Sequence, residues 1–216
     1  MNRTILTIVI VLLAVSLATA KSSKLVMSWK NPNYVARKFH RVLALGLSDK
    51  TGVLANFEDA LAEQLAATGM ETIPGNSILL RPEGTQFDLN YLKTQVRENQ
   101  IDAVVVSRLI KVDNTVTYIP GSAYVAPFPY YNTFYGYYGA VYPVVYSPDY
   151  LREEKREEKK VRIETNLYVI SSQEGEFVWT GVTDTFNPSN IQKAINGLVK
   201  LVVKQMQIDQ ALRPPQ

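Results

Sequence analysis

The chain has 216 residues, of which 46% are hydrophobic and 20% charged, and this length and composition suit one folded domain with a sizeable core. The formal net charge of +3 is too small to indicate a nucleic acid as the partner. The chain contains no cysteine and one histidine, which excludes disulfides and zinc sites built from these two residue types.

The first twenty residues have the three parts of a secretory signal peptide. Arg3 supplies the positive charge, Ile5 to Leu17 form an apolar run, and Ala18-Thr19-Ala20 fits the cleavage site. Because this run is shorter than the roughly 20 residues that span a bilayer, cleavage is preferred over the alternative of a retained anchor. We therefore expect an exported chain whose residues 21–216 form one domain. The absence of cysteine excludes a lipid anchor after the signal.

The first half of this domain predicts strands that alternate with helices. Residues 21–38 are polar and irregular apart from "MSWKNP", which contains Trp29, and residues 39–48 then form a short aliphatic run that predicts the first strand. From Val53 to Ala67 apolar residues recur every four positions, which predicts an amphipathic helix. Glu58 and Asp59 are expected on the solvated face of this helix.

A second strand is expected in the sequence "METIPG", residues 70–75, and a second helix follows that Asp88 can cap. The continuous apolar run from Ala103 to Val106 then suits a central parallel strand that is covered on both faces. Strands that alternate with helices imply parallel crossover units, so this half of the domain is predicted to be α/β.

A tyrosine-rich insertion, at about residues 118–152, separates the two halves of the domain. From Tyr118 to Tyr150 it holds ten of the thirteen tyrosines and five of the eleven prolines. Its rings can pack on the domain's own sheet or form a docking surface, and both alternatives stay open. A membrane-inserting hairpin is disfavoured, because the prolines remove backbone donors. A loop of this length without regular structure tends to be functional or disordered.

The residues after the insertion predict a β-hairpin. Residues 161–169 alternate between apolar and polar, which predicts a strand with one buried and one solvated face. Gly175 can supply the positive φ of the turn. Residues 177–186 then return as the partner strand, with Trp179 expected on the same face as Phe177.

A last amphipathic helix follows, for which Ser189 and Gln192 fit a capping box. The predicted fold class is therefore α/β, with a mixed β-sheet flanked by helices. Its elements follow the order β-α-β-α-β, the Tyr/Pro-rich excursion, a β-hairpin and the C-terminal helix.

No pattern for catalysis is visible in the sequence. His40, the one histidine, lies in the first predicted strand and lacks the glycine frame of a nucleophile elbow. The glycine motifs that bind phosphates and the calcium-loop pattern are both missing. The charged run from Arg152 to Lys160 mixes both signs and is interpreted as solvated surface. We therefore predict a non-enzymatic protein with no catalytic residues, no metal and no cofactor.

The composition of the insertion predicts an interaction function. We expect the chain to bind another envelope component through these rings, because tyrosine is enriched where proteins meet. Binding of a small ligand or glycan is the alternative, and a peripheral contact with a membrane stays open. The candidate binding residues are Tyr130, Tyr131, Phe134, Tyr135, Tyr137 and Tyr138.

Five stretches taken together carry a resemblance: "MSWKNPNY", the strand that ends in "LGLS", "NFEDALAEQLAATG", "IDAVVVSRL" and "ETNLYVISSQEGEFVWTGVTDTF". With the Tyr/Pro/Gly-rich stretch and the closing helix, they resemble a family of uncharacterised bacterial envelope lipoproteins classed as a domain of unknown function. The order of elements is also similar to the amino-terminal domain of TolB and the periplasmic domain of the curli secretion protein CsgG. This resemblance implies a location in the periplasm or at the periplasmic face of the outer membrane. Many members carry a lipidated cysteine after the signal, where this chain has Ala20-Lys21.

Overall fold

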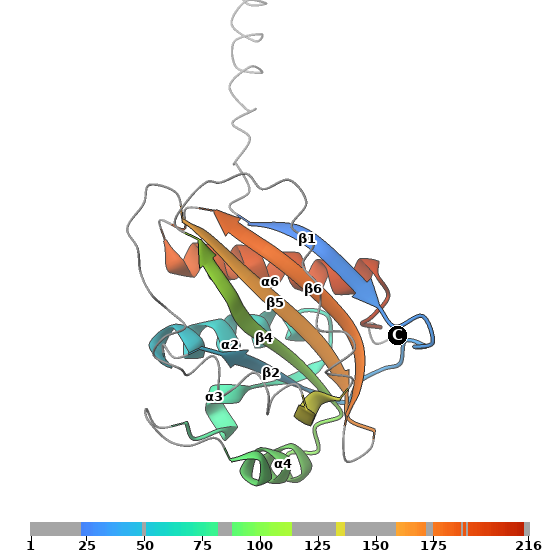
Figure 1. Ribbon diagram of the computed structural model, residues 1–216. Helices are drawn as coiled ribbons and strands as arrows, with labels where there is room; N and C mark the ends of the chain where they lie inside the picture. The colour runs from blue at the N-terminus through green and yellow to red at the C-terminus, as the bar shows by residue number, and fades with distance from the viewer. Residues whose placement is uncertain are drawn as a thin grey trace, which may run out of the picture.

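The computed structural model describes residues 23–48, 51–81, 88–113, 133–136, 159–171, 175–186, 188 and 190–213. They form an α/β fold with one mixed six-stranded sheet of order β1-β6-β5-β4-β2-β3, which confirms the predicted fold class (Figure 1). The strands are β1 Ser23–Lys30, β2 Arg41–Leu47, β3 Glu71–Pro74, β4 Ala103–Asp113, β5 Lys160–Val169 and β6 Glu176–Phe186. The helices are α2 Thr51–Ala66, α3 Gly75–Ile78, α4 Leu89–Glu98 and α6 Ile191–Ile208.

The sheet is parallel on one side and antiparallel on the other. β2 pairs in parallel with both β3 and β4, whereas β4, β5, β6 and β1 follow one another in antiparallel pairs. On β4, Val104 and Val105 point to opposite faces and both are fully buried. The predicted central strand is therefore confirmed, with a parallel neighbour on one side only.

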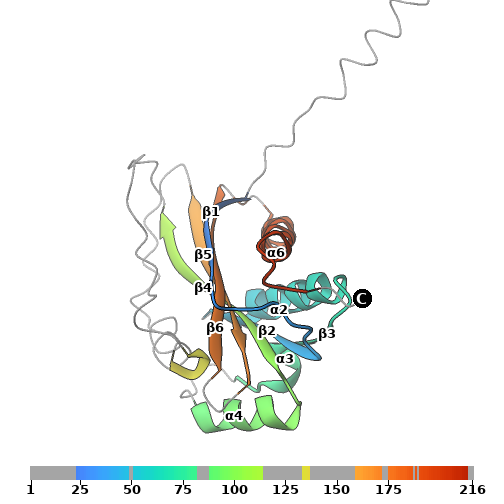
Figure 2. The same ribbon diagram turned by 90° about the vertical axis from the view of Figure 1, so that its right-hand side faces the viewer.

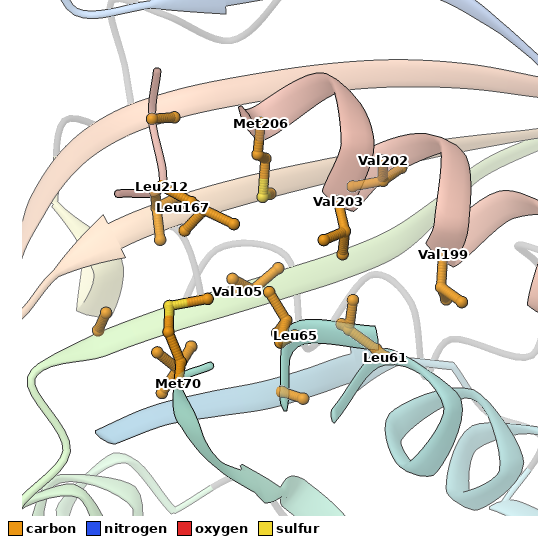
Figure 3. Close-up of a cluster of buried hydrophobic side chains, with 14 of the residues drawn as sticks. Leu61, Leu65, Met70, Val105, Leu167, Val199, Val202, Val203, Met206 and Leu212 are labelled. Atoms are coloured by element: carbon orange, nitrogen blue, oxygen red, sulfur yellow. The ribbon is translucent and has the colours of Figure 1, made fainter. Parts of the chain in front are cut away.

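Two hydrophobic cores lie on the two faces of the sheet. Helices α2 and α6 cover one face (Figure 2), and their side chains meet those of the sheet in the first core. Figure 3 shows Leu61 and Leu65 of α2 and Val203 and Met206 of α6 around Val105 of β4. The second core lies on the opposite face and includes buried residues of β2, β4 and α4 together with residues from the insertion.

Strand β1 was not predicted, because residues 21–38 were expected to be irregular. It lies at the edge of the sheet, and β6 is its one neighbour among the strands that the structure describes. The register shifts between Leu25 and Met27, so the alternation of apolar and polar residues breaks inside the strand. Because the bulge interrupts this edge strand, its apolar residues Leu25, Val26, Met27 and Trp29 do not follow the two-residue period that marks a buried strand.

The prediction that Trp179 shares a face with Phe177 was wrong. Leu167 pairs with Trp179, whereas the next residue of β5, Tyr168, pairs with Phe177. The bulge therefore adds Val178 to β6 and reverses the alternation beyond it. Trp179 lies in the first core, and Phe177 packs against the second.

The helix caps are partly as expected. Asp88 caps α4, since its carboxylate accepts hydrogen bonds from the backbone N–H groups of Asn90 and Tyr91. The cap of α6 is Asn190, whose Oδ1 accepts from the N–H of Lys193 at 2.8 Å. The expected cap, Ser189, was thus one residue too early and lies outside the described residues.

Gly181→Ala should destabilise the protein by about 1–3 kcal/mol, because a Cβ at this position would overlap the buried indole ring of Trp179. Gly52→Ala is the matched control, since a Cβ at this position in α2 would meet no atom within 4 Å apart from its chain neighbours and the adjacent helix backbone. We expect the Gly52→Ala variant to be as stable as the wild type, or more stable by at most about 0.5 kcal/mol. Urea unfolding of both variants checks the prediction, and equal losses would contradict it.

Candidate functional site

The structure places two of the six candidate binding residues. Phe134 is fully buried and Tyr135 is 6% exposed, and both belong to the second core. These two rings therefore pack on the chain's own sheet instead of facing a partner. The other four candidates lie outside the described residues, and their role stays a prediction: Tyr130, Tyr131, Tyr137 and Tyr138.

Phe134 and Tyr135 belong to a row of five aromatic rings that lies on the sheet. The ring centroid of Phe134 lies 5.1 Å from that of Tyr135 and 5.5 Å from that of Tyr168 on β5. Tyr168 lies 5.3 Å from Phe177 on β6, which stacks on Trp29 of β1 at 5.4 Å. We call these five residues the aromatic cluster. Such ring pairs add to the stabilisation that comes from burial alone.

The backbone of the insertion also joins the sheet, at residues 133–136, which we call the anchor (yellow in Figures 1 and 2). Thr133 forms an isolated antiparallel bridge with Glu176, and the N–H of Phe134 donates to the carbonyl of Gly175 at 3.3 Å. Gly175 has a φ of 71°, as predicted for the hairpin turn. A Cβ there would lie 3.0 Å from the Cβ of Phe134, so glycine also makes room for the anchor.

Helix α4 supports the anchor from the other side. The ammonium of Lys93 lies 4.8 Å from the ring centroid of Tyr135, a cation–π contact. Leu92 and Val96 of the same helix are buried in the second core with Tyr135. The anchor is therefore held by both a helix and the β5–β6 turn.

The polar face of β5 is buried, which corrects the prediction of a solvated face. Glu164 is 1% exposed, and its carboxylate lies 2.6 Å from Nε of Arg108, the residue of β4 with which it pairs. Asp184 on β6 accepts two hydrogen bonds from Arg162, at 2.7 and 2.8 Å. Alternation could not show this, because a charged side chain is buried at low cost only where an opposite charge faces it.

The next cross-strand pair on this face is Asn166 with Thr180, which are 2% and 1% exposed. Neither Oδ1 of Asn166 nor Oγ1 of Thr180 has a hydrogen-bond partner within the described part of the chain. Buried polar atoms are normally satisfied, so a group that donates hydrogen bonds would be stabilised at this pair.

Glu58 was predicted on the surface of α2 and is instead fully buried, whereas Asp59 is exposed as expected. The carboxylate of Glu58 accepts a hydrogen bond from the N–H of Gly46 at 2.8 Å and lies 2.6 Å from the guanidinium of Arg81. Arg81 also donates to the carbonyl of Gly46 at 3.2 Å. Helical spacing explains this position, since Glu58 follows buried Leu54 by four residues and so shares its face.

Two features of the surroundings have opposite effects on the pKa of Glu58. Burial raises the pKa of the Glu58 carboxyl above its ordinary value, while the hydrogen bond and charge of Arg81 oppose the rise. Each of the three buried acids in the described part of the chain, Glu58, Glu164 and Asp184, is thus ion-paired with an arginine.

His40 is exposed and lies just before β2, outside the strand in which it was expected. The backbone N–H groups of His40 and Arg41 donate to the carboxylate of Asp102, at 2.7 and 3.0 Å. No group of three or more His, Asp or Glu side chains that could hold a metal ion occurs among the described residues. Within the same residues, no helix is both long and apolar enough to cross a bilayer.

The chain was compared with known proteins. No protein-family model matches it, and no curated protein matches it. Two solved structures of the PelC dodecamer from Paraburkholderia phytofirmans, one of them a point variant, are similar at 12% sequence identity. The variant has a TM-score of 0.45 and covers 84% of this chain and 96% of its own chain. The other has a TM-score of 0.44 and covers 89% and 99%. Likeness at this level carries no conclusion about activity or assembly.

Sequence reasoning selected Phe134 and Tyr135 but missed the residues that hold them. The sequence predicts strands that contain Tyr168 and Phe177 but gives these rings no role, and it assigns Trp29 to no helix or strand. A usable signal was present, because Tyr168 is a large aromatic residue on a strand face that was expected to be solvated.

Proposed function

We propose that this chain is a non-enzymatic, exported interaction module that docks another envelope component through the aromatic residues beside the anchor. The observation that carries the proposal is the burial of Phe134 and Tyr135 in the middle of the tyrosine-rich run. Two buried rings, a backbone bridge and a cation–π contact fix this point of the insertion to the domain.

Chain connectivity keeps the other candidate tyrosines near the anchor. Tyr130 and Tyr131 precede Phe134 by four and three residues, and Tyr137 and Tyr138 follow Tyr135 by two and three. Since a chain extends by at most about 3.6 Å per residue, these four residues lie within about 15 Å of the buried pair.

Tyrosine is suited to this use for a physical reason. Its ring offers a large, rigid contact area with a polar tip, and it loses little side-chain entropy when a partner binds. Attachment at the anchor also reduces the conformational freedom that the flanking residues lose on association, which favours binding.

The proposed location is the periplasm or the periplasmic face of the outer membrane, without a lipid anchor. The signal-peptide pattern of residues 1–20 and the resemblance to envelope lipoproteins support this location. Both remain predictions from the sequence.

Crosslinking in cells tests the docking proposal. The wild type should give a discrete larger species, and serine at all four of positions 130, 131, 137 and 138 should abolish it while the melting temperature falls by less than about 2 °C. Ile208→Ser is the matched control, because Ile208 is 61% exposed on α6. It should leave the species intact. A crosslinked species that survives the four serines would contradict docking, and a large fall in melting temperature would show that these rings are packed on the domain.

The pair Asn166 and Thr180 favours a second candidate function, the binding of a small ligand or glycan. Both side chains are buried, so a ligand would reach them only after the residues that cover them move, and each could then accept a hydrogen bond from a hydroxyl group. Quenching of the protein fluorescence by peptidoglycan fragments or oligosaccharides, lost in Asn166→Ala, separates this function from docking. The absence of quenching would exclude it.

A further inference from the structure

Several chain segments start or stop at one end of the sheet. β1 begins and β6 ends there, since Ser23 pairs with Thr185. β4 ends and β5 begins at the same level, because Asp113 pairs with Lys160 and Lys160 pairs with Phe186. Figure 1 shows these strand ends together at the top of the sheet. We call this region the Ser23 end.

The Ser23 end exposes large apolar side chains next to positive charge. Phe186, the last residue of β6, is 38% exposed, and Ile191, the first residue of α6, is 56% exposed. The ammonium of Lys24 lies 5.0 Å from the centre of the Phe186 ring, and Lys193 is exposed in the first turn of α6. Aromatic and aliphatic side chains with adjacent lysines are typical of protein surfaces that contact a membrane interface.

Among the described residues at the Ser23 end, both acidic side chains are paired with basic ones. Asp184 is almost fully buried and forms the bidentate pair with Arg162. Asp113 lies 2.6 Å from the ammonium of Lys111 and 3.5 Å from that of Lys160. The net charge of these side chains is therefore positive, which complements an anionic surface.

The sequence before β1 ties the same end to the membrane. Ser23 follows Leu17, the end of the apolar run, by six residues, so the two lie within about 22 Å of one another. Whenever this run lies in a bilayer, during export or as a retained anchor, the Ser23 end is held close to the lipid headgroups.

We propose that the Ser23 end binds the surface of an anionic phospholipid membrane. Phe186 and Ile191 enter the interface, and Lys24 and Lys193 face the headgroups. This inference is independent of the docking proposal, which concerns the opposite end of the sheet, where Gly175 and the anchor lie.

The cysteine-free sequence allows a direct test in the full chain. A single Ile191→Cys variant carries a polarity-sensitive dye and is mixed with vesicles of phosphatidylethanolamine and phosphatidylglycerol. The dye emission should shift to the blue and should be quenched by spin-labelled lipid. Val35→Cys is the matched control, because Val35 is 83% exposed in the β1–β2 connection at the opposite end. Its dye should report water.

Charge reversal and lipid composition complete the test. Lys24→Glu and Lys193→Glu, each in the labelled chain, should weaken binding to these vesicles by at least about five-fold per lysine, the effect expected for the loss of one positive charge. Binding to vesicles of phosphatidylcholine alone should be weaker than to the anionic vesicles. Equal signals from positions 191 and 35, or a response that ignores both the lysines and the lipid charge, would overturn the proposal. A shift that occurs without vesicles and grows with protein concentration would also overturn it, in favour of a second copy.

Discussion

Glu58→Ala should lower the free energy of unfolding by about 3–5 kcal/mol, which is among the largest effects expected of a single substitution in this chain. The change leaves the guanidinium of Arg81, which is 11% exposed, without its carboxylate at 2.6 Å. It also removes the acceptor of the Gly46 N–H. A buried charge and a buried donor thus lose their partner together. Urea unfolding at neutral pH measures the loss.

Two further variants show whether the buried pair is the cause. Glu58→Gln keeps the side-chain length and an acceptor oxygen, so it should lose less than Glu58→Ala. Asp59→Ala changes an exposed acid on the same helix and should alter stability by about 0.5 kcal/mol or less. A Glu58→Ala variant that loses no more than Asp59→Ala would show that the ion pair adds nothing.

The pH dependence of stability identifies which force dominates at Glu58. Because burial raises the pKa of this carboxyl, the folded state binds a proton at higher pH than the unfolded state does. The wild type should therefore gain stability relative to Glu58→Gln as the pH falls through the raised pKa toward the ordinary pKa of glutamate. The gain is complete below that ordinary pKa and is lost as the pH rises again. Unfolding of both proteins between about pH 4 and pH 8 measures the difference, and the opposite trend would show that Arg81 outweighs burial.

Phe134→Ala should also destabilise the domain by about 3–5 kcal/mol. The ring is fully buried and touches Tyr135 and Tyr168, so its loss opens a cavity in the second core and releases the anchor from β5. Phe134→Leu fills most of that space and should lose only about 1 kcal/mol. Urea unfolding measures both variants.

A surface substitution provides the comparison for Phe134. Phe186→Ala removes the same side chain from a site that is 38% exposed, and it should have a small effect on stability. If docking is correct, Phe134→Ala should also weaken the crosslinked species at temperatures where the protein stays folded, because the neighbouring tyrosines lose their attachment. Equal stability of the Phe134 and Phe186 variants would contradict the packing of the anchor.

Residues with a local physical role could be predicted from the sequence, whereas residues defined by contacts across the sheet could not. Asp88 as a cap and Gly175 in the turn follow from rules that act within a few residues. The extra residue Val178 in β6 leaves no trace in composition, yet it decides which face Trp179 and Phe177 occupy. The same limit applies to Glu58, whose partner Arg81 is 23 residues away.

For the candidate site, composition identified the segment but not the direction of each ring. Phe134 is fully buried, and a phenylalanine needs no hydrogen-bond partner in that position. The ring of Tyr135 is oriented by its cation–π contact with Lys93 on α4. These residues are 42 positions apart, so no local pattern could show the contact. Alternation along β5 likewise predicted a wet face where Arg108 and Arg162 make burial of acids favourable.

The pairing of β1 with β6 has a consequence for the order in which the molecule assembles. The hydroxyl groups of Ser23 and Thr185 lie 2.8 Å apart although 162 positions separate the two residues. The first strand to be synthesised must therefore wait, with both of its edges unpaired, until almost the whole chain has emerged. Closing so long a loop is slow, so the backbone groups of β1 stay open to pairing with other strands until β6 has formed.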